Sequence, residues 1–299
     1  WLVESPPLFL GLSALWLSRL KGARLIFNVS DLWPESAVRL GVLDSDSLAF
    51  RWSSRLEALC YERAWLVSGQ SQSTVASVKE RFPKCPTYHF SNGVDTQVFD
   101  SSRATAAARA TLLGHSEGEK VVALYAGLHG LAQGLDQILE LAKTLRNDPG
   151  LGFVLIGDGP EKAALMRRAA ELDLANVRFL DPRPASEIPA LLAAADVVLV
   201  PLKRLIPGAV PSKLYESMAS RRPTLLLASG EPADLVRRHQ AGLVVNPGDI
   251  EGLSEAIRKL QKSQELRQVY GENGRQAAES YFDRRVIVDR FLDHLEEHL

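Results

Sequence analysis

The chain has little cysteine, almost no net charge and no long apolar run, and each of these absences excludes a class of protein. Its two cysteines, Cys60 and Cys85, lie far apart and lack metal-ligand spacing, which is typical of a reducing compartment rather than a disulfide framework. A formal net charge of −1 leaves no basic field that would attract nucleic acid. The apolar stretch from Leu8 to Leu20 has thirteen residues, whereas a membrane-spanning helix needs about 20. We therefore expect a cytoplasmic protein without a nucleic-acid partner.

The length and the hydrophobic content are what the chain does have. With 299 residues, 46% of them hydrophobic, it can form two domains with a core each. The first residue is Trp1 instead of Met, and no charged segment precedes the apolar stretch. We therefore expect that the natural N-terminus is missing. The first hundred residues hold only three or four predicted strands, so we also expect the first sheet to be incomplete.

The stretch from Leu8 to Leu20 is apolar nearly all round and is followed by basic residues. One interpretation is a helix packed on a sheet, because buried helices are apolar on all sides. The other is a helix that lies on the inner face of the cell membrane, with Arg19, Lys21 and Arg24 facing anionic headgroups. The sequence leaves both open.

The loop Ser30-Asp-Leu-Trp-Pro-Glu35 follows a predicted strand, Arg24 to Val29. It places two carboxylates, Asp31 and Glu35, at a strand end, where ligand clefts open in parallel sheets. The alternative is structural, with Asp31 or Ser36 capping the next helix. Further on, residues 96–120 are rich in alanine, serine and charge, which indicates a domain boundary.

From Val121 onwards short apolar runs alternate with helical stretches, which predicts β-α-β units and a parallel sheet. Six strands with their helices make one doubly wound domain. The predicted strands are Val121–Ala126, Phe153–Gly157, Val177–Leu180, Val197–Pro201, Thr224–Ala228 and Leu243–Val245.

Three loops of this domain follow strand ends and are expected at one edge of the sheet. The first, residues 127–134, and the second, residues 157–160, are rich in glycine, which lets backbone approach a phosphate closely. The third, residues 207–223, begins a helix near Pro211 and Ser212, whose free amides attract an anion. Each loop alone is equally consistent with a plain turn. Together they predict a nucleotide site.

The third loop also supplies charge, because Lys213 and Glu216 lie three residues apart on one helical face. At these residues the chain resembles the retaining glycosyltransferases of the GT-B fold, family 4 (group 1). It is most similar to the branch that builds bacterial O-antigen and capsular polysaccharide on lipid-linked acceptors. The motifs that carry the resemblance are SPPLFLGL, DLWPES, NGVD, the 127–134 loop, GDGP, the 193–201 strand and PSKLYESMA.

The resemblance implies an α/β protein with two Rossmann-like doubly wound domains, the first of them incomplete here. Residues 1–100 would be the acceptor domain, residues 101–282 the nucleotide-sugar domain, and residues 283–299 a helix that packs back on the first domain. It further implies that Glu216 holds the ribose. The implied nucleotide-sugar residues are Gly127, Leu128, Gly130, Gln133, Gly157, Asp158, Gly159, Pro211, Ser212, Lys213, Leu214 and Glu216. The implied catalytic groups are Asp31, Glu35 and Lys213.

The chain departs from the family pattern at several charged positions. Gly208 occupies the place of an acid that reads the sugar, and Ser30 occupies the place of a histidine. Uncharged Leu128 and Gln133 replace an arginine and a lysine that face the diphosphate. The cations that remain as candidates for the leaving diphosphate are Lys213, Lys203 and Arg204.

The function implied is transfer of a hexose or N-acetylhexosamine from a nucleotide diphosphate sugar, with UDP favoured, to a lipid-linked saccharide. We expect no cofactor and no metal, because the sequence shows no dense acidic or histidine cluster. An anionic membrane surface is a further expected partner. Two alternatives stay open: a nucleotide-binding module without activity, and a GT-B-fold UDP-N-acetylglucosamine 2-epimerase.

Overall fold

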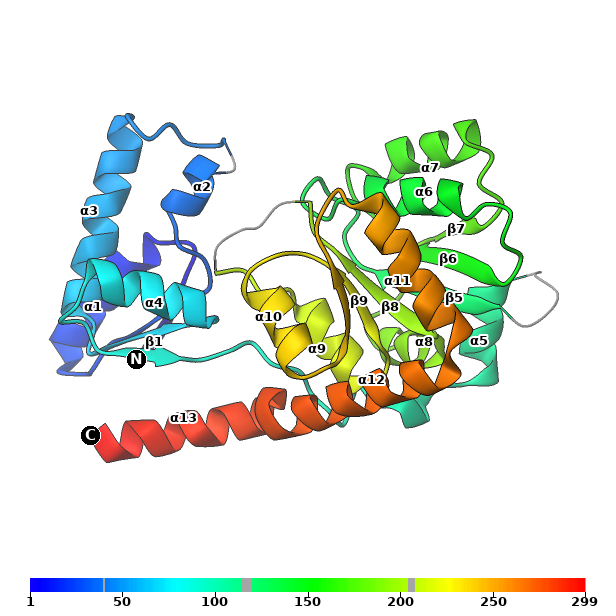
Figure 1. The fold of residues 1–299 in the computed structure, drawn as a ribbon. Coiled ribbons are helices and arrows are strands. Elements are labelled where there is room, and N and C mark those ends of the chain that lie inside the picture. Colours follow the sequence, from blue (N-terminus) through cyan, green and yellow to red (C-terminus); the bar gives the residue numbers. More distant parts are fainter. Residues whose placement is uncertain (40, 115–119, 204–207, 299) are drawn as a thin grey trace. The chain divides into compact units, whose positions relative to one another are not determined.

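A computed structural model describes residues 1–39, 41–114, 120–203 and 208–298. The chain divides into two compact units. The first is formed by Trp1–Asn92 with a short piece of the later loop at residues 208–210, and the second by the rest of the described residues. Each unit is built on one parallel β-sheet with helices packed against it (Figure 1).

The first unit contains a four-stranded sheet in the order β1-β2-β3-β4. Strands β2 and β3 are buried along their whole length, as the near-continuous apolar runs of parallel strands predict. Strand β1 was not anticipated, because only pairing with β2, Leu2 opposite Ile26, orders this half-exposed segment. The strands are β1 (Leu2–Ser5), β2 (Ile26–Val29), β3 (Leu66–Gly69) and β4 (Thr87–His89). The helices are α1 (Leu10–Lys21), α2 (Glu35–Arg39), α3 (Leu48–Arg63) and α4 (Gln72–Arg81).

Helix α1 is buried on one side only. Its buried residues include Ala14 and Leu15, and a side chain at Gly11 would overlap Sγ of Cys60 on α3. Glycine therefore lets the two helices approach closely. The opposite side of α1 and the residue before it expose large apolar side chains, namely Phe9, Leu10, Leu12, Trp16 and Leu20. Helix α1 therefore packs within the first unit on one side, and its exposed apolar side chains explain why the stretch is apolar nearly all round.

None of the described helices combines the length and the apolar character that crossing a bilayer requires.

The second unit contains a six-stranded sheet in the order β10-β9-β8-β5-β6-β7, in which neighbouring strands pair in parallel. This is the strand order of a doubly wound Rossmann domain, and it confirms the fold class expected from the alternating pattern. The strands are β5 (Val121–Ala126), β6 (Leu151–Ile156), β7 (Val177–Leu180), β8 (Val197–Pro201), β9 (Thr224–Leu227) and β10 (Gly242–Val245). The helices are α5 (Ala106–Leu113), α6 (Asp136–Thr144), α7 (Lys162–Glu171), α8 (Ile188–Ala194), α9 (Ser212–Ala219), α10 (Glu231–Arg238), α11 (Ile250–Lys262), α12 (Gln264–Ala277) and α13 (Arg284–His298).

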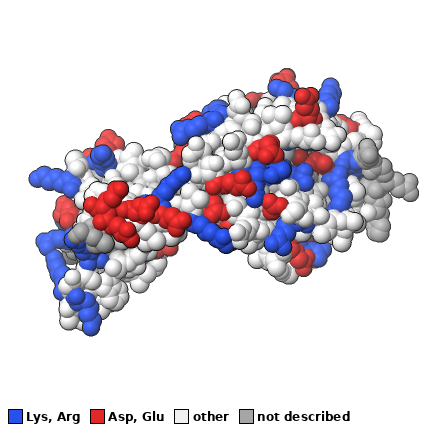
Figure 2. Space-filling model, turned by 90° about the horizontal axis from the view of Figure 1, so that it is seen from below, with Lys and Arg blue, Asp and Glu red and all other residues white. Residues whose placement is uncertain are grey.

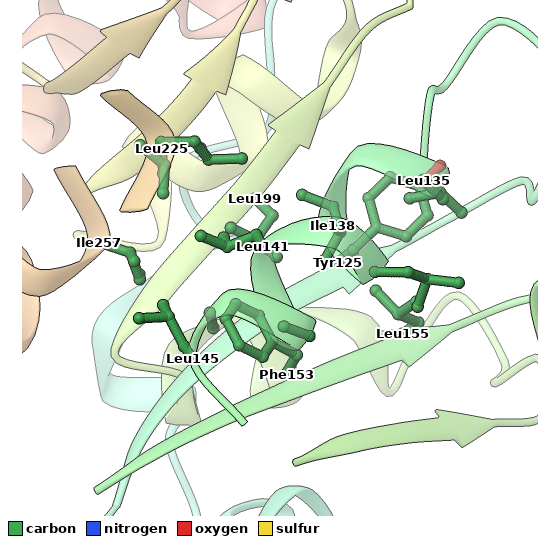
Figure 3. Packing of buried hydrophobic residues seen from close by; sticks show 14 of the residues in the cluster. Tyr125, Leu135, Ile138, Leu141, Leu145, Phe153, Leu155, Leu199, Leu225 and Ile257 are labelled. Atoms are coloured by element: carbon green, nitrogen blue, oxygen red, sulfur yellow. The ribbon is translucent and has the colours of Figure 1, made fainter. Parts of the chain in front are cut away.

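The core of the second unit lies between its sheet and helices α6, α7 and α11, while α8 and α9 pack on the other face (Figure 1). Alternate sheet residues such as Tyr125, Phe153 and Leu199 meet Leu141 and Ile257 from the helices (Figure 3). All five side chains are fully buried. Burying a side chain of this size stabilises the fold by about 1.5–3 kcal/mol, which makes this sheet a rigid base for the loops at its edge.

The segment that follows β4 belongs to the second unit because buried polar contacts tie it there. Arg275, 8% exposed, donates to the carbonyls of Thr96, Phe99 and Ala219. Asp283 accepts hydrogen bonds from Thr96 at the start of α13. From the sequence we expect the domain boundary after residue 100, whereas in the structure residues 93–100 group with the second unit. That α13 packs on the first unit stays a prediction.

Candidate functional site

The loops after β5, β6 and β7, together with the start of α9 and Phe99, line a cavity of about 510 Å³ within the second unit. Parallel strands bring their carboxyl ends to one edge of a sheet, and that edge is where doubly wound proteins bind ligands. The lining residues are Phe99, Ala126, Gly127, Leu128, Ile156, Gly157, Asp158, Pro182, Arg183, Ala185, Ile188, Lys213 and Glu216.

The two glycine-rich loops are joined at the base of this cavity by backbone contacts. The amide of Gly127 donates to the carbonyl of Ile156 at 2.8 Å, and the amide of His129 donates to that of Asp158 at 2.7 Å. Gly157 has φ 142°, and a Cβ there would overlap the carbonyl oxygen of Gly127. Glycine is required at position 157 because the two loops approach too closely for a side chain.

Helix α9 brings its N-terminus and Lys213 to the same cavity. Pro211 is the extended N-cap residue, with φ −68° and ψ 133°, and Ser212 is the first helical residue. The side chain of Lys213 crosses over Gly127, since a Cβ at Gly127 would overlap its Cε. Its Nζ lies 5.7 Å from the ring centre of Tyr125, whose hydroxyl donates to the carbonyl of Leu128 at 2.6 Å. The helix dipole and the ammonium therefore combine to favour an anion here.

Glu216 lies one turn after Lys213 and also lines the cavity. Burial raises the pKa of its carboxyl, while Lys213, Ser212 and Arg284 act in the opposite direction. A partly desolvated carboxylate is a strong acceptor for hydroxyl groups, because hydrogen bonds to charged groups are stronger than neutral ones. The arrangement suits a ligand that carries a diphosphate at one end and vicinal hydroxyls nearby.

The structure brings some of the predicted nucleotide residues together and leaves others out of the lining. Gly127, Leu128, Gly157, Asp158, Lys213 and Glu216 line the cavity. Of the others, Leu214 is fully buried in the core, so its side chain is not available to a ligand. The remaining predicted residues outside the lining are Gly130, Gln133, Gly159, Pro211 and Ser212.

The cations proposed for the diphosphate do not all line the cavity. Lys203 pairs with Asp136 at 3.6 Å and is not in the lining, and Arg204 lies outside the described residues. We did not expect Arg183 from the sequence, although it follows β7, where the strand-end rule places ligand contacts. Its guanidinium lies 3.9 Å from Glu187, which is a weak pairing. Among the described residues that line the cavity, Arg183 and Lys213 carry the positive charge.

The predicted catalytic carboxylates Asp31 and Glu35 belong to the first unit, in the loop after β2. Asp31 accepts a hydrogen bond from the hydroxyl of Ser36 at 2.8 Å. Glu35 forms an ion pair with Arg39 one helical turn later, at 2.5 Å. Both partners of that pair are more than a third exposed, so the pair contributes little to stability. Neither carboxylate is fixed in a buried network.

Gly208, where the family pattern has an acid, is held in a left-handed conformation with φ 82°. A Cβ at this position would overlap Oγ1 of Thr74, within the first unit. The position therefore has no room for a side chain, and a carboxylate cannot be supplied from it.

Comparison with known proteins identifies the family. The family described as "Glycosyl transferases group 1" matches residues 113–277, more than half of the chain. The chain belongs to this family. The match covers the loops after β5, β6 and β7 and the start of α9, which are the elements that form the cavity.

Two bacterial relatives extend the similarity beyond the matched residues. WbjE of Pseudomonas aeruginosa, described as a glycosyltransferase, is 30% identical over 244 residues, which cover 80% of this chain and 60% of the relative. WcaI of Escherichia coli, described as a glycosyl transferase of colanic acid biosynthesis, is 26% identical over 301 residues, covering 97% of this chain and 72% of the relative. The chain thus spans about three fifths of the length of WbjE.

Solved structures show the same fold. HepE of Anabaena, solved in complex with UDP, superimposes with a TM-score of 0.81 at 19% identity, over 99% of this chain and 78% of that protein. It has also been solved with UDP-glucose. The fold is therefore that of the GT-B glycosyltransferases, as the sequence motifs predicted.

Proposed function

We propose that this chain transfers a hexose or N-acetylhexosamine from a UDP-sugar to a lipid-linked saccharide during synthesis of a bacterial surface polysaccharide. The observation that carries the proposal is the cavity at the carboxyl edge of the second sheet, where Lys213, in the first turn of α9, and Glu216 meet two glycine loops. The names of WbjE and WcaI, and the UDP complexes of HepE, support the substrate class.

In the proposed complex the diphosphate lies between the glycine loops and the start of α9. Lys213 and the α9 amides stabilise the charge that develops on the diphosphate as the sugar leaves. Glu216 accepts hydrogen bonds from the two ribose hydroxyls. Because the residues that line the cavity supply this charge, we propose that the transfer does not depend on a metal ion.

The proposed transfer retains the anomeric configuration. The acceptor hydroxyl attacks the anomeric carbon from the side of the departing diphosphate, the bond to the leaving oxygen breaks, and that oxygen takes the proton. Asp31 and Glu35 are the proposed acidic groups on the acceptor side. They would orient the acceptor rather than hold the nucleotide.

A thermal-shift panel of UDP-, GDP- and ADP-sugars tests the donor assignment. A ligand present at 100 times its Kd should stabilise the protein by about 2.7 kcal/mol. We expect UDP-sugars to raise the melting temperature of the wild type and not of Glu216→Ala. Equal shifts in both proteins would exclude the cavity as the donor site.

Transfer itself requires a second assay, because nucleotide binding alone is also expected of a module without activity. Incubation with UDP-N-acetylglucosamine should release UDP only when a lipid-linked acceptor is present. The amount of UDP released should be the same with and without EDTA. Epimerised sugar formed without any acceptor would instead indicate an epimerase, and binding without turnover an inactive module.

We further propose that the first unit docks on an anionic membrane through α1 and α3. Both helices expose apolar side chains, including Trp16 on α1 and Trp52 on α3, and Arg55 lies over the Trp52 ring at 5.6 Å. The last turn of α1 adds Arg19 and Lys21. Aromatic and basic side chains together are what the headgroup region of anionic lipids binds.

Sedimentation with liposomes tests this docking. We expect binding to phosphatidylglycerol vesicles that weakens in high salt, and a clear loss on Trp16→Ser. Val42→Ser is the matched control, because Val42 is 79% exposed but lies outside both helices. An equal effect of the two substitutions, or binding that ignores lipid charge, would contradict the proposal.

A further inference from the structure

The last two turns of α13 carry three side chains of metal-ligand type on one face. His294, Glu297 and His298 are spaced i, i+3 and i+4, and such positions are neighbours on a helix surface. One ligand atom from each lies within 4.8 Å of the others. From the sequence we expect no dense acidic or histidine cluster, although the helix predicted over residues 283–299 already implies this spacing.

The two imidazoles are already oriented. Their ring centres are 4.3 Å apart with planes inclined at 40°. Nδ1 of His298 lies 2.8 Å from the carbonyl oxygen of His294. A carbonyl only accepts hydrogen bonds, so Nδ1 carries the proton and Nε2 carries the lone pair. Histidines that bind metals are fixed in the same way, by a hydrogen bond from their second ring nitrogen.

The charge around these residues favours a dication. Glu297 contributes a carboxylate, and the carboxyl end of a helix carries a partial negative charge. Asp293 and Glu296 lie in the same two turns. Figure 2, which views the molecule from below, shows Asp and Glu side chains gathered along α13.

We propose that His294, Glu297 and His298 form a binding site for a late first-row divalent cation such as Zn²⁺. Two imidazoles and a carboxylate are ligands that Zn²⁺ accepts, whereas Mg²⁺ prefers oxygen alone. Tetrahedral Zn²⁺ with bonds near 2.0–2.1 Å holds its ligand atoms roughly 3.3 Å apart. Rotation of the exposed Glu297 and His298 and the partly buried His294 would have to close the present separation, which is within 4.8 Å, to that value.

This site is distinct from the proposed donor site. None of the three residues lines the cavity at Lys213 and Glu216. A cation bound between positions i and i+4 cross-links one turn, so its effect is to hold the end of α13 helical. Removal of the metal should therefore leave UDP binding unchanged.

Isothermal titration of the 299-residue chain, without a histidine tag and after EDTA treatment, with ZnCl₂ alone tests the site. We expect one Zn²⁺ per chain, and a Kd raised roughly tenfold or more by His294→Ala or His298→Ala. Co²⁺ in place of Zn²⁺ should give the visible absorption of a tetrahedral site. Alanine is the best helix former, so circular dichroism should show both variants folded.

Glu296→Gln is the matched control for Glu297→Gln. The two neighbouring side chains carry the same charge, but only Glu297 lies close to both histidines in the proposed site. We expect Glu297→Gln to weaken Zn²⁺ binding and Glu296→Gln to change it less than twofold. Equal weakening by both would mean that Zn²⁺ is attracted by the general negative charge of this helix end and not bound by Glu297. Saturable binding that survives the loss of both histidines, or no binding at all, would also overturn the proposal.

Discussion

Glu216 offers the sharpest test of the donor site, because its predicted effects on binding and on stability have opposite signs. Glu216→Gln keeps the shape of the side chain and removes its charge. A hydrogen bond to a charged group contributes about 1.5–3 kcal/mol, and a neutral one about 0.5–1.5 kcal/mol. Two ribose hydroxyls that lose the charged acceptor therefore cost about 2–3 kcal/mol, which is a roughly 30- to 150-fold increase in the Kd for UDP.

The same substitution should not destabilise the unliganded protein. Burial raises the pKa of Glu216 above its ordinary value of 4.5, so the folded state binds its proton more tightly than the unfolded state does. Stability then falls as the pH rises through this window, and at neutral pH the carboxylate is a cost to folding. Glu216→Gln removes that cost, so we expect an unchanged or higher melting temperature without ligand.

Calorimetric titration with UDP and thermal unfolding without it check both signs in one protein preparation. Glu171→Gln is the matched control, since Glu171 is exposed at the end of α7 and lies outside the cavity lining. We expect the control to bind UDP as the wild type does. A Kd of Glu216→Gln within threefold of the wild type, or weaker binding accompanied by a lower melting temperature, would refute the assignment.

Three further predictions concern α9 and the two glycine-rich loops. Lys213→Met keeps the stem over Gly127 but removes the charge, so UDP affinity should fall at least about tenfold and become less sensitive to salt in titrations at two ionic strengths. Gly157→Ala should destabilise the protein by about 1–3 kcal/mol in calorimetry, because φ there is 142° and a Cβ overlaps backbone, whereas Gly152→Ala, with open space around it, should not. Burial and Lys162 lower the pKa of His129 from 6.5, so the unfolded state binds its proton more readily and stability should fall as the pH drops below about 6.5. Urea unfolding at pH 5.5 and 7.5 should show this slope in the wild type and a smaller one in His129→Leu; equal slopes would mean that His129 does not titrate in this range.

The alternation of strands and helices from residue 121 onwards could be predicted because it depends on local patterns. Apolar runs of strand length, helix starts such as Pro211 and glycines at turns are each encoded within a few residues. Strand boundaries such as Val121–Ala126 and Val177–Leu180 were therefore predicted to the residue. Strand β1 was not, because Leu2–Ser5 becomes a strand only by pairing with a distant segment.

Part of the candidate site could be predicted because it also depends on local sequence patterns. The family motifs and the strand-end rule located Gly127, Gly157, Lys213 and Glu216, which share one cavity. The phase of α9 decided that Leu214 points into the core while its neighbour Lys213 lines the cavity. Helical periodicity alone could not show which of these two adjacent residues points into the core, because the pattern of so short a helix is compatible with more than one orientation.

By itself, the sequence determined the parallel α/β fold of the second unit and the family, since both rest on residue types at short spacings. Only the tertiary structure decided which loop residues line the cavity, how Arg183 and Phe99 join it from distant segments, and that Gly208 has no room for an acid. These outcomes depend on helix phase, on the close approach of backbones and on contacts between remote segments, which no short stretch of sequence encodes.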